Sequence, residues 1–306
     1  MTIIDMHAHV AHLELFPRSF LSGMKEVLRR RAADEQGVAL ASALMERLIA
    51  RRLSDPRCEE LLAQMDAAGI TRCVLLIADL AYDEDPEGHS LQRTYEHYHA
   101  MLQAHPDRFV VFGGSDPRRG TWGLSLFERG VRDCGFRGLK LYPPCGFEID
   151  DPALSPYYEL CEAHDIPVLV HTGPSLPSMR GDQEYPESLL RAAQRFPRVR
   201  FVLGHGAFQS PDINIPVAVE RRNVYLEASG FQRLLEEREI LEQRLQTLFR
   251  QVPDQVLFGT DWPVFNLFGS QHDWVRLFQD LLTRYDAERF FWRNAEPLVA
   301  ARPPPS

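Results

Sequence analysis

Short apolar runs alternate with longer amphipathic segments along almost the whole chain. A short run bounded by turn residues is typical of a strand buried on both faces, as in a parallel sheet. The eight runs cover residues 3–10, 73–78, 109–113, 138–142, 167–170, 200–203, 224–228 and 256–258. The intervening segments predict helices at residues 58–68, 91–104, 124–134, 157–164, 186–195 and 234–249. The last helix has an apolar face formed by Leu234, Leu241, Leu245 and Leu248.

Eight strands separated by helices predict a closed parallel barrel rather than an open doubly wound sheet. A chain of 306 residues suits such an α/β barrel as one domain. No glycine-rich dinucleotide-binding motif follows any of the runs. We therefore expect a (β/α)8 TIM barrel that occupies residues 1–306 as a single domain.

Residues 12–54 interrupt the alternation directly after the first strand and predict an irregular, helix-rich insertion. Because the loops that follow barrel strands lie at the active end, we expect this insertion to form a lid over the mouth. Between Arg18 and Arg52 it holds eight basic and four acidic residues. These basic residues either form a solvated helix face or reach an anionic substrate, and Arg30 and Arg51 are the positions to test.

The overall composition, with 44% hydrophobic and 25% charged residues, is that of an ordinary globular protein. The net charge of −9 argues against nucleic-acid binding over a broad basic face. The five cysteines form no C-x-x-C pair and are odd in number, which favours reduced thiols and a cytoplasmic protein. We expect no signal peptide and no membrane contact, because the first strand begins by residue 3 and no apolar stretch is long enough to span a bilayer. A homodimer is the default expectation for assembly.

Polar residues stand at the carboxyl ends of five predicted strands. His7 and His9 are two positions apart, so both side chains project from the same side of an extended strand. Four later strands end in Lys140, His171, His205 and Asp261. Each residue alone has a structural explanation, as a core histidine, a snorkelling lysine or a helix cap. Together they meet at the functional face of a barrel, and nitrogen and carboxylate ligands suit zinc or a related divalent ion.

Several motifs resemble those of the amidohydrolase superfamily of metal-dependent TIM-barrel enzymes. They are Ile-Asp-Met-His-Ala-His at 4–9, Gly-Phe-Arg-Gly-Leu-Lys at 135–140, Pro-Val-Leu-Val-His-Thr-Gly at 167–173, Phe-Val-Leu-Gly-His-Gly at 201–206 and Gly-Thr-Asp-Trp-Pro at 259–263. The chain is most similar to the amidohydrolase-related branch, amidohydrolase 2, which contains decarboxylases and a lactonase. The resemblance extends over nearly the whole chain but leaves out residues 12–54.

By this resemblance, one catalytic divalent ion, with Zn2+ favoured and Mn2+ as the alternative, would be bound by His7, His9, His171 and Asp261. Asp261 would also take the proton of a metal-activated water, and His205 would polarise or orient the reacting group. Lys140 allows two interpretations. In binuclear members the corresponding lysine is carboxylated and bridges two ions. With one ion, which we favour, a free Lys140 could bind a substrate carboxylate or carbonyl.

Other residues near the strand ends are candidates for the pocket. Tyr142, Glu227 and Trp262 are expected to bind substrate, and Cys145 and Ser229 are weaker candidates, with packing or loop solvation as the competing explanation. Cys145 is not expected to act as a nucleophile, because a metal-activated water already fills that role.

The resemblance implies an enzyme and leaves its reaction open, while the arginine-rich insertion suggests that its substrate is small and anionic. The favoured hypothesis is a metal-dependent hydrolase of an ester, lactone or amide. The alternative is a non-oxidative, metal-dependent decarboxylase of an aromatic or muconate-like carboxylic acid. A third hypothesis, a barrel that has lost activity and serves as a binding subunit, is disfavoured by the intact set of ligand residues.

Overall fold

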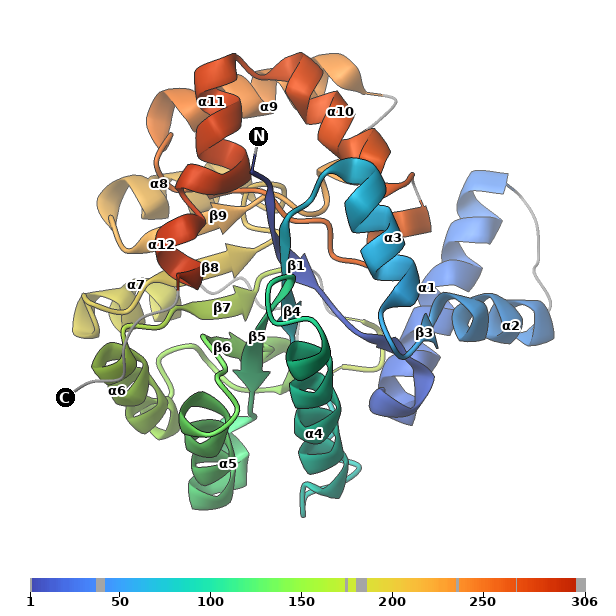
Figure 1. Ribbon diagram of the computed structural model, residues 1–306, viewed down its shortest axis with the longest axis vertical. Coiled ribbons are helices and arrows are strands. Elements are labelled where there is room, and N and C mark those ends of the chain that lie inside the picture. The colour runs from blue at the N-terminus through green and yellow to red at the C-terminus, as the bar shows by residue number, and fades with distance from the viewer. Residues whose placement is uncertain are drawn as a thin grey trace.

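The fold is that of a computed structural model, which describes residues 2–36, 42–173, 176–179, 186–234, 237–267 and 269–300. Eight parallel strands occupy its centre (Figure 1) and pair in the order in which they follow along the chain. They are β1 (Ile4–Ala8), β4 (Arg72–Leu76), β5 (Phe109–Gly114), β6 (Leu139–Leu141), β7 (Val168–His171), β8 (Phe201–Gly204), β9 (Val224–Glu227) and β10 (Val256–Leu257). Each overlaps one of the predicted apolar runs.

The last strand lies next to the first, so the sheet closes on itself. Beyond β10, the backbone N–H of Met6 donates to the carbonyl of Phe258 at 3.0 Å. Two further bonds run from His9 N–H to the carbonyl of Trp262 at 2.8 Å and from Asp261 N–H to that of His7 at 2.6 Å. The predicted (β/α)8 TIM barrel is therefore confirmed, and closure places residues 7–9 beside residues 261–262.

Helices surround the barrel (Figure 1). They are α3 (Glu59–Ala68), α4 (His89–Ala104), α5 (Gly120–Arg132), α6 (Ser155–His164), α7 (Pro186–Arg195), α8 (Pro211–Glu220), α9 (Arg238–Gln251), α10 (Gln271–Leu281), α11 (Arg284–Glu288) and α12 (Glu296–Val299). The prediction that a helix starts at Leu234 was wrong: Leu234 ends a short 3-10 turn, and α9 begins only after Glu237, whose ψ of 50° is not helical. Within the described part of the chain, no helix has the length and apolar character needed to cross a bilayer.

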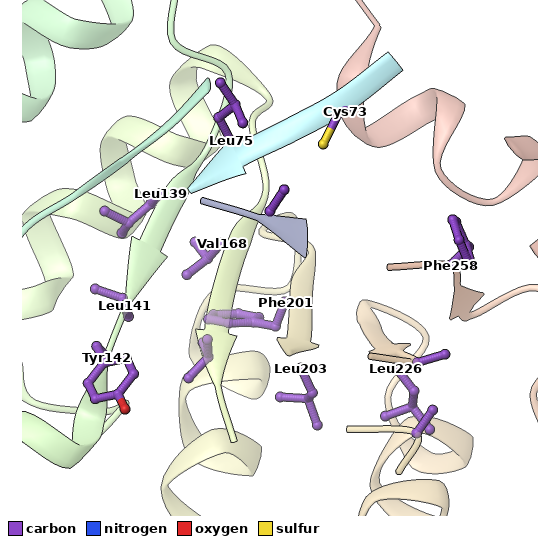
Figure 2. Packing of buried hydrophobic residues seen from close by; sticks show 14 of the residues in the cluster. Cys73, Leu75, Leu139, Leu141, Tyr142, Val168, Phe201, Leu203, Leu226 and Phe258 are labelled. Carbon is purple, nitrogen blue, oxygen red and sulfur yellow. The ribbon is translucent and has the colours of Figure 1, made fainter. Parts of the chain in front are cut away.

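Alternation along the strands divides their apolar residues into two layers. The inner cluster contains Ile4, Met6, Val74, Leu76, Val110, Phe112, Leu169, Val202 and Leu257. The outer cluster, part of which Figure 2 shows, packs against the helices and includes Cys73, Leu75, Leu139, Leu141, Val168, Phe201 and Leu203. Because Leu139 and Leu141 belong to the outer cluster, the side chain of Lys140 between them points into the barrel.

The predicted helical insertion follows β1. Its base is a two-stranded ladder of β2 (Ala11–His12) and β3 (Ser54–Asp55), and between them lie α1 (Arg18–Gln36) and α2 (Ser42–Arg52). Figure 1 shows both helices beside the barrel rather than in its helical ring. The carboxylate of Glu84, in the loop after β4, accepts hydrogen bonds from the first two N–H groups of α1 at 3.0 and 2.7 Å. This contact at a helix N-terminus joins the insertion to the barrel.

Candidate metal centre and active site

A cavity of about 200 Å3 lies at the carboxyl ends of the strands. Its lining includes all six polar residues that the sequence placed there, His7, His9, Lys140, His171, His205 and Asp261. His7 and Lys140 are each 1% exposed, and His205 and Asp261 are 5% and 6% exposed. Titratable side chains from five strands thus share one largely water-excluded space.

Three ligand atoms in this cavity converge on one point. The Nε2 atoms of His7 and His9 each lie 3.5 Å from Oδ1 of Asp261. Two ligands about 2.1 Å from one ion, at a tetrahedral angle, are roughly 3.4 Å apart. The spacing of these three atoms therefore suits a divalent metal ion.

Hydrogen bonds on the far side of each ring turn both Nε2 atoms toward this point. Nδ1 of His7 lies 2.8 Å from Oε2 of Glu227, and Nδ1 of His9 lies 2.8 Å from the carbonyl oxygen of Leu76. Because these partners accept hydrogen bonds, the proton of each neutral ring belongs on Nδ1, which leaves the Nε2 lone pair for a metal. Burial, followed by the charge of Lys140, lowers the pKa of His7 well below its usual value and that of His9 to about 3. Both rings are therefore in the neutral form that binds metals.

Asp261 is held in place by a buried aspartate on the first strand. The backbone of Asp261 adopts the left-handed region with a φ of 51°. Residues other than glycine seldom hold this conformation unless their surroundings impose it. The carboxylate of Asp5 accepts hydrogen bonds from the N–H and hydroxyl of Thr260 at 2.9 and 2.6 Å, and from His7 N–H at 3.0 Å. Asp5 therefore ties the segment that carries Asp261 to the strand that carries His7.

His171 and His205 lie on the other side of the cavity. The His205 ring centroid is 4.9 Å from those of both His7 and His171, and Nε2 of His205 is 4.0 Å from Oδ2 of Asp261. The His171 ring is stacked obliquely against Tyr142, with centroids 4.4 Å apart. Among the residues that the structure describes, His171 is not one of the three whose ligand atoms converge, so its role as a metal ligand stays a prediction.

Lys140 is a buried cation without a hydrogen-bond partner for Nζ among the described residues. Burial lowers its pKa to about 8, although the charges of Asp261 and Glu227 act in the opposite direction. Burial likewise raises the pKa of Asp261 well above its usual value. A lysine in this setting can bind an anionic group that enters the cavity.

The three residues predicted to bind substrate take different positions. Tyr142 lines the cavity, as expected. Glu227 is 0% exposed and lies behind His7, so its carboxylate contacts the histidine ring and not the cavity. Trp262 is 2% exposed and packs in the outer apolar cluster. Of the three, only Tyr142 lines the cavity, and its contact with a substrate stays a prediction.

The two weaker candidates also lie off the cavity. Ser229 is completely buried and its hydroxyl contacts Glu227 and His205. Cys145 is buried beside the carbonyl of Asp79, and burial raises the pKa of its thiol. A thiol with a raised pKa is a poor nucleophile, in agreement with the expectation for Cys145.

The apolar residues that line the cavity were not predicted from the sequence. The insertion contributes Leu15, Phe16, Phe20, Met24 and Leu53, and the loops after later strands contribute Leu176, Phe208, Val264 and Phe265. The available signal was the presence of large apolar residues in a segment expected to lie over the mouth. Such residues cover a substrate only if the insertion turns them inward, which the local sequence does not specify.

The insertion also places a basic residue at the cavity. Arg52, the last residue of α2, is among the lining residues, as is Arg233 from the turn after β9. Arg30 instead pairs with Glu26 at 2.7 Å on an exposed helix face, and Arg51 is exposed. Of the two alternatives for the basic residues, the solvated face therefore describes Arg30 and Arg51, and Arg52 is the residue of α2 placed to meet an anionic substrate, because successive helical side chains point about 100° apart.

Comparison with known proteins gives a family match over almost the whole chain. A family model described as amidohydrolase matches residues 4–300. No curated protein matches the chain significantly.

Solved structures of similar fold cover nearly the same length. An uncharacterized TIM-barrel protein from Bordetella bronchiseptica is 24% identical, with a TM-score of 0.68 and coverage of 98% of this chain and 99% of that one. The 5-carboxyvanillate decarboxylase of Novosphingobium aromaticivorans, complexed with manganese and 4-hydroxy-3-methoxy-5-nitrobenzoic acid, is 20% identical, with a TM-score of 0.68 and coverage of 98% and 96%. A dihydroxybenzoic acid decarboxylase from Polaromonas, with bound manganese and 2-nitroresorcinol, is 19% identical, with a TM-score of 0.66 and coverage of 97% and 96%.

Proposed function

The chain belongs to the amidohydrolase family, and we propose that it is a metal-dependent, non-oxidative decarboxylase of a small aromatic carboxylic acid. The observation that carries this proposal is the buried ammonium of Lys140. It lies in a mostly apolar cavity and has no hydrogen-bond partner for Nζ among the described residues. Hydrolysis, which the sequence analysis favoured, is the second candidate.

The cavity has room for one substituted ring. Its volume of about 200 Å3 exceeds the roughly 150 Å3 of a protein cavity that holds benzene. Tyr142 and Phe265 offer aromatic surfaces on which a ring can pack. A ring that carries a carboxylate and one or two further small groups matches this space.

Lys140 is the chain's own partner for the reacting carboxylate. A buried ammonium with no hydrogen-bond partner among the described residues is unfavourable even with the charges of Asp261 and Glu227 nearby, and a bound carboxylate supplies both a partner and a negative charge. The divalent ion would be held by His7, His9 and Asp261, with His171 as the predicted fourth ligand, and when bound it would polarise the oxygen atoms of the substrate. The sequence favoured Zn2+ as this ion, but similar structures contain manganese, so we consider Mn2+ and Zn2+ equally suitable.

An apolar cavity favours the loss of carbon dioxide. A carboxylate withdrawn from water loses its hydration, which favours breaking its carbon–carbon bond to release neutral carbon dioxide. The electron pair of that bond stays on the ring carbon, which takes up a proton as carbon dioxide leaves. Asp261 and His205 are placed to hold and deliver this proton.

A hydrolase would use the same residues differently. Asp261 would accept a proton from the attacking water, and His205 would orient the carbonyl group. An ester, lactone or amide group is itself neutral, so a hydrolase substrate would need a separate anionic group to pair with Lys140, whereas in a carboxylic acid the reacting group itself carries the charge. Similar structures that are decarboxylases of hydroxylated aromatic acids add support for decarboxylation.

A parallel assay separates the two reactions. Protein loaded with Mn2+ or Zn2+ is incubated with hydroxybenzoic and muconate-like acids, and released carbon dioxide is measured. The same preparations are tested against lactones, esters and amides. We expect carbon dioxide from at least one acid and none with the Asp261→Asn variant. Hydrolysis of a lactone, ester or amide without carbon dioxide from any acid would replace this proposal with a hydrolase.

A further inference from the structure

Glu227 and Ser229 form a completely buried hydrogen-bonded unit between two histidines of the cavity. We infer that this pair positions His7 and His205 by fixing which ring nitrogen carries the proton, so that both Nε2 atoms face the cavity as bare lone pairs. The inference rests on the metal site of the proposed function and not on its reaction, because it holds equally for a hydrolase.

The hydrogen bonds around Glu227 leave it only the role of acceptor. Its Oε1 accepts from the backbone N–H of Ser229, and its Oε2 accepts from the backbone N–H of His205 at 3.0 Å. Backbone N–H groups can only donate. Nδ1 of His7, 2.8 Å from the same Oε2, must therefore carry the proton of its ring.

The hydroxyl of Ser229 passes this constraint on to His205. Its single hydrogen is donated to Oε2 of Glu227 at 2.7 Å, so its oxygen must accept from Nδ1 of His205 at 2.8 Å. An independent contact agrees: the backbone carbonyl of Ser229, which can only accept, lies 3.3 Å from the same Nδ1. His205 thus carries its proton on Nδ1.

The consequence for His205 is a defined chemical role. Its Nε2, 4.0 Å from Oδ2 of Asp261, faces the cavity without a proton. The neutral ring therefore first accepts a hydrogen bond or a proton from the substrate or a water molecule, and only afterwards can donate it. A substrate with a hydroxyl group next to its reacting carbon would supply such a donor.

The backbone around Glu227 is shaped to hold its carboxylate. A Cβ atom at Gly259 would lie 2.1 Å from Oε1 of Glu227 and 3.0 Å from Cβ of His7. Only glycine leaves this space free. The close approach of the backbone at Gly259 to Glu227 and His7 therefore helps to hold the Glu227 carboxylate in place.

Two substitutions separate the effects on the two histidines. In Glu227→Gln, the amide NH2 group faces existing donors in either orientation, either His7 and His205 or the N–H of Ser229. We expect metal affinity to fall about 10- to 100-fold, as on loss of other partners of metal-binding histidines. Ser229→Ala keeps the contact between Glu227 and His7, so metal affinity should stay near that of the wild type. His205 then keeps only the 3.3 Å contact of its Nδ1 with the backbone carbonyl of residue 229, so the share of its Nδ1–H tautomer should fall.

The experiment uses the full-length protein loaded with Zn2+ and labelled with 15N-histidine. Long-range 1H–15N spectra identify the protonated nitrogen of each ring, and competition with a fluorescent chelator measures zinc affinity. We expect the Nδ1–H form for His7 and His205 in the wild type and an altered His205 signal in Ser229→Ala. An Nε2–H form of His205 in the wild type, or unchanged zinc affinity in Glu227→Gln, would overturn the inference.

The controls keep this result independent of folding and of the reaction. Thermal unfolding of the metal-free variants shows whether each is folded, and the wild-type spectrum decides the tautomers even if Glu227→Gln does not fold. A wild-type protein with the expected spectrum but no decarboxylase activity would refute the proposed function and leave this inference in place.

Discussion

Replacing Lys140 with methionine should make the metal-free protein more stable and the enzyme less active. Burial lowers the pKa of this lysine from 10.5 to about 8, and its Nζ has no hydrogen-bond partner among the described residues. One pKa unit corresponds to about 1.4 kcal/mol, so the buried charge costs on the order of 3 kcal/mol of folding free energy. Methionine keeps most of the side-chain volume without the charge, and the free energy of unfolding should rise by up to this amount.

The pH dependence of stability follows from the direction of the shift. Below pH 8 the lysine is protonated in both the folded and the unfolded state, so the cost is fully present. Between pH 8 and 10.5 the folded protein loses its proton first, and the cost disappears. Urea unfolding of the metal-free proteins should therefore show a difference at pH 7 that becomes smaller as the pH rises through this interval.

The effect on activity has the opposite sign. Removing one partner of a buried charge pair typically costs about 2–5 kcal/mol, so kcat/KM for an acid substrate should fall by roughly 30- to 5,000-fold. Arg30→Met is the matched control, because Arg30 is 61% exposed, pairs with Glu26 and is not among the residues that line the cavity. A Lys140→Met variant that unfolds at lower urea concentration, or one with unchanged kcat/KM, would refute the reasoning.

Three further substitutions test other parts of the site. Asp261→Asn should leave the far-ultraviolet circular dichroism spectrum unchanged but lower turnover by at least about 100-fold, because it removes the oxygen that holds the proton; near-normal turnover would contradict this role. Arg52→Glu should raise KM for anionic substrates about tenfold or more, since Arg52 lines the cavity, whereas Arg30→Glu should not; equal effects of the two would argue against it. Gly259→Ala should destabilise the protein by about 1–3 kcal/mol and weaken metal binding, because the added methyl group overlaps Glu227; unchanged metal affinity in a chelator competition would count against this packing.

The strands and the residues at their ends could be predicted from the sequence because their signals are local. A strand buried on both faces is continuously apolar, so His171 after Val168-Leu169-Val170 is conspicuous without any knowledge of the fold. Eight such strands leave the barrel as the natural closed arrangement, and a parallel barrel brings all carboxyl ends to one side. Lys140, His205 and Asp261 could therefore be assigned to one site from a chain read in order.

Which residues line the cavity and which lie behind it depends on contacts between residues far apart in the chain. Glu227 looks like a cavity residue in the sequence, yet closure of the barrel places it behind His7, 220 positions away. Left-handed backbones at His205 and Asp261, with φ of 68° and 51°, turn these side chains in a way that no period-two pattern predicts.

In the insertion too, the role of a residue depends on tertiary packing. Arg51 and Arg52 are neighbours with the same chemistry, and only the packing of α2 decides that Arg52 lines the cavity while Arg51 faces solvent. Local sequence determined which residues lie at the ends of strands, because burial imposes a pattern on each strand separately. Tertiary structure decided which atoms meet, because ring closure and the packing of the insertion act over distances that no local pattern records.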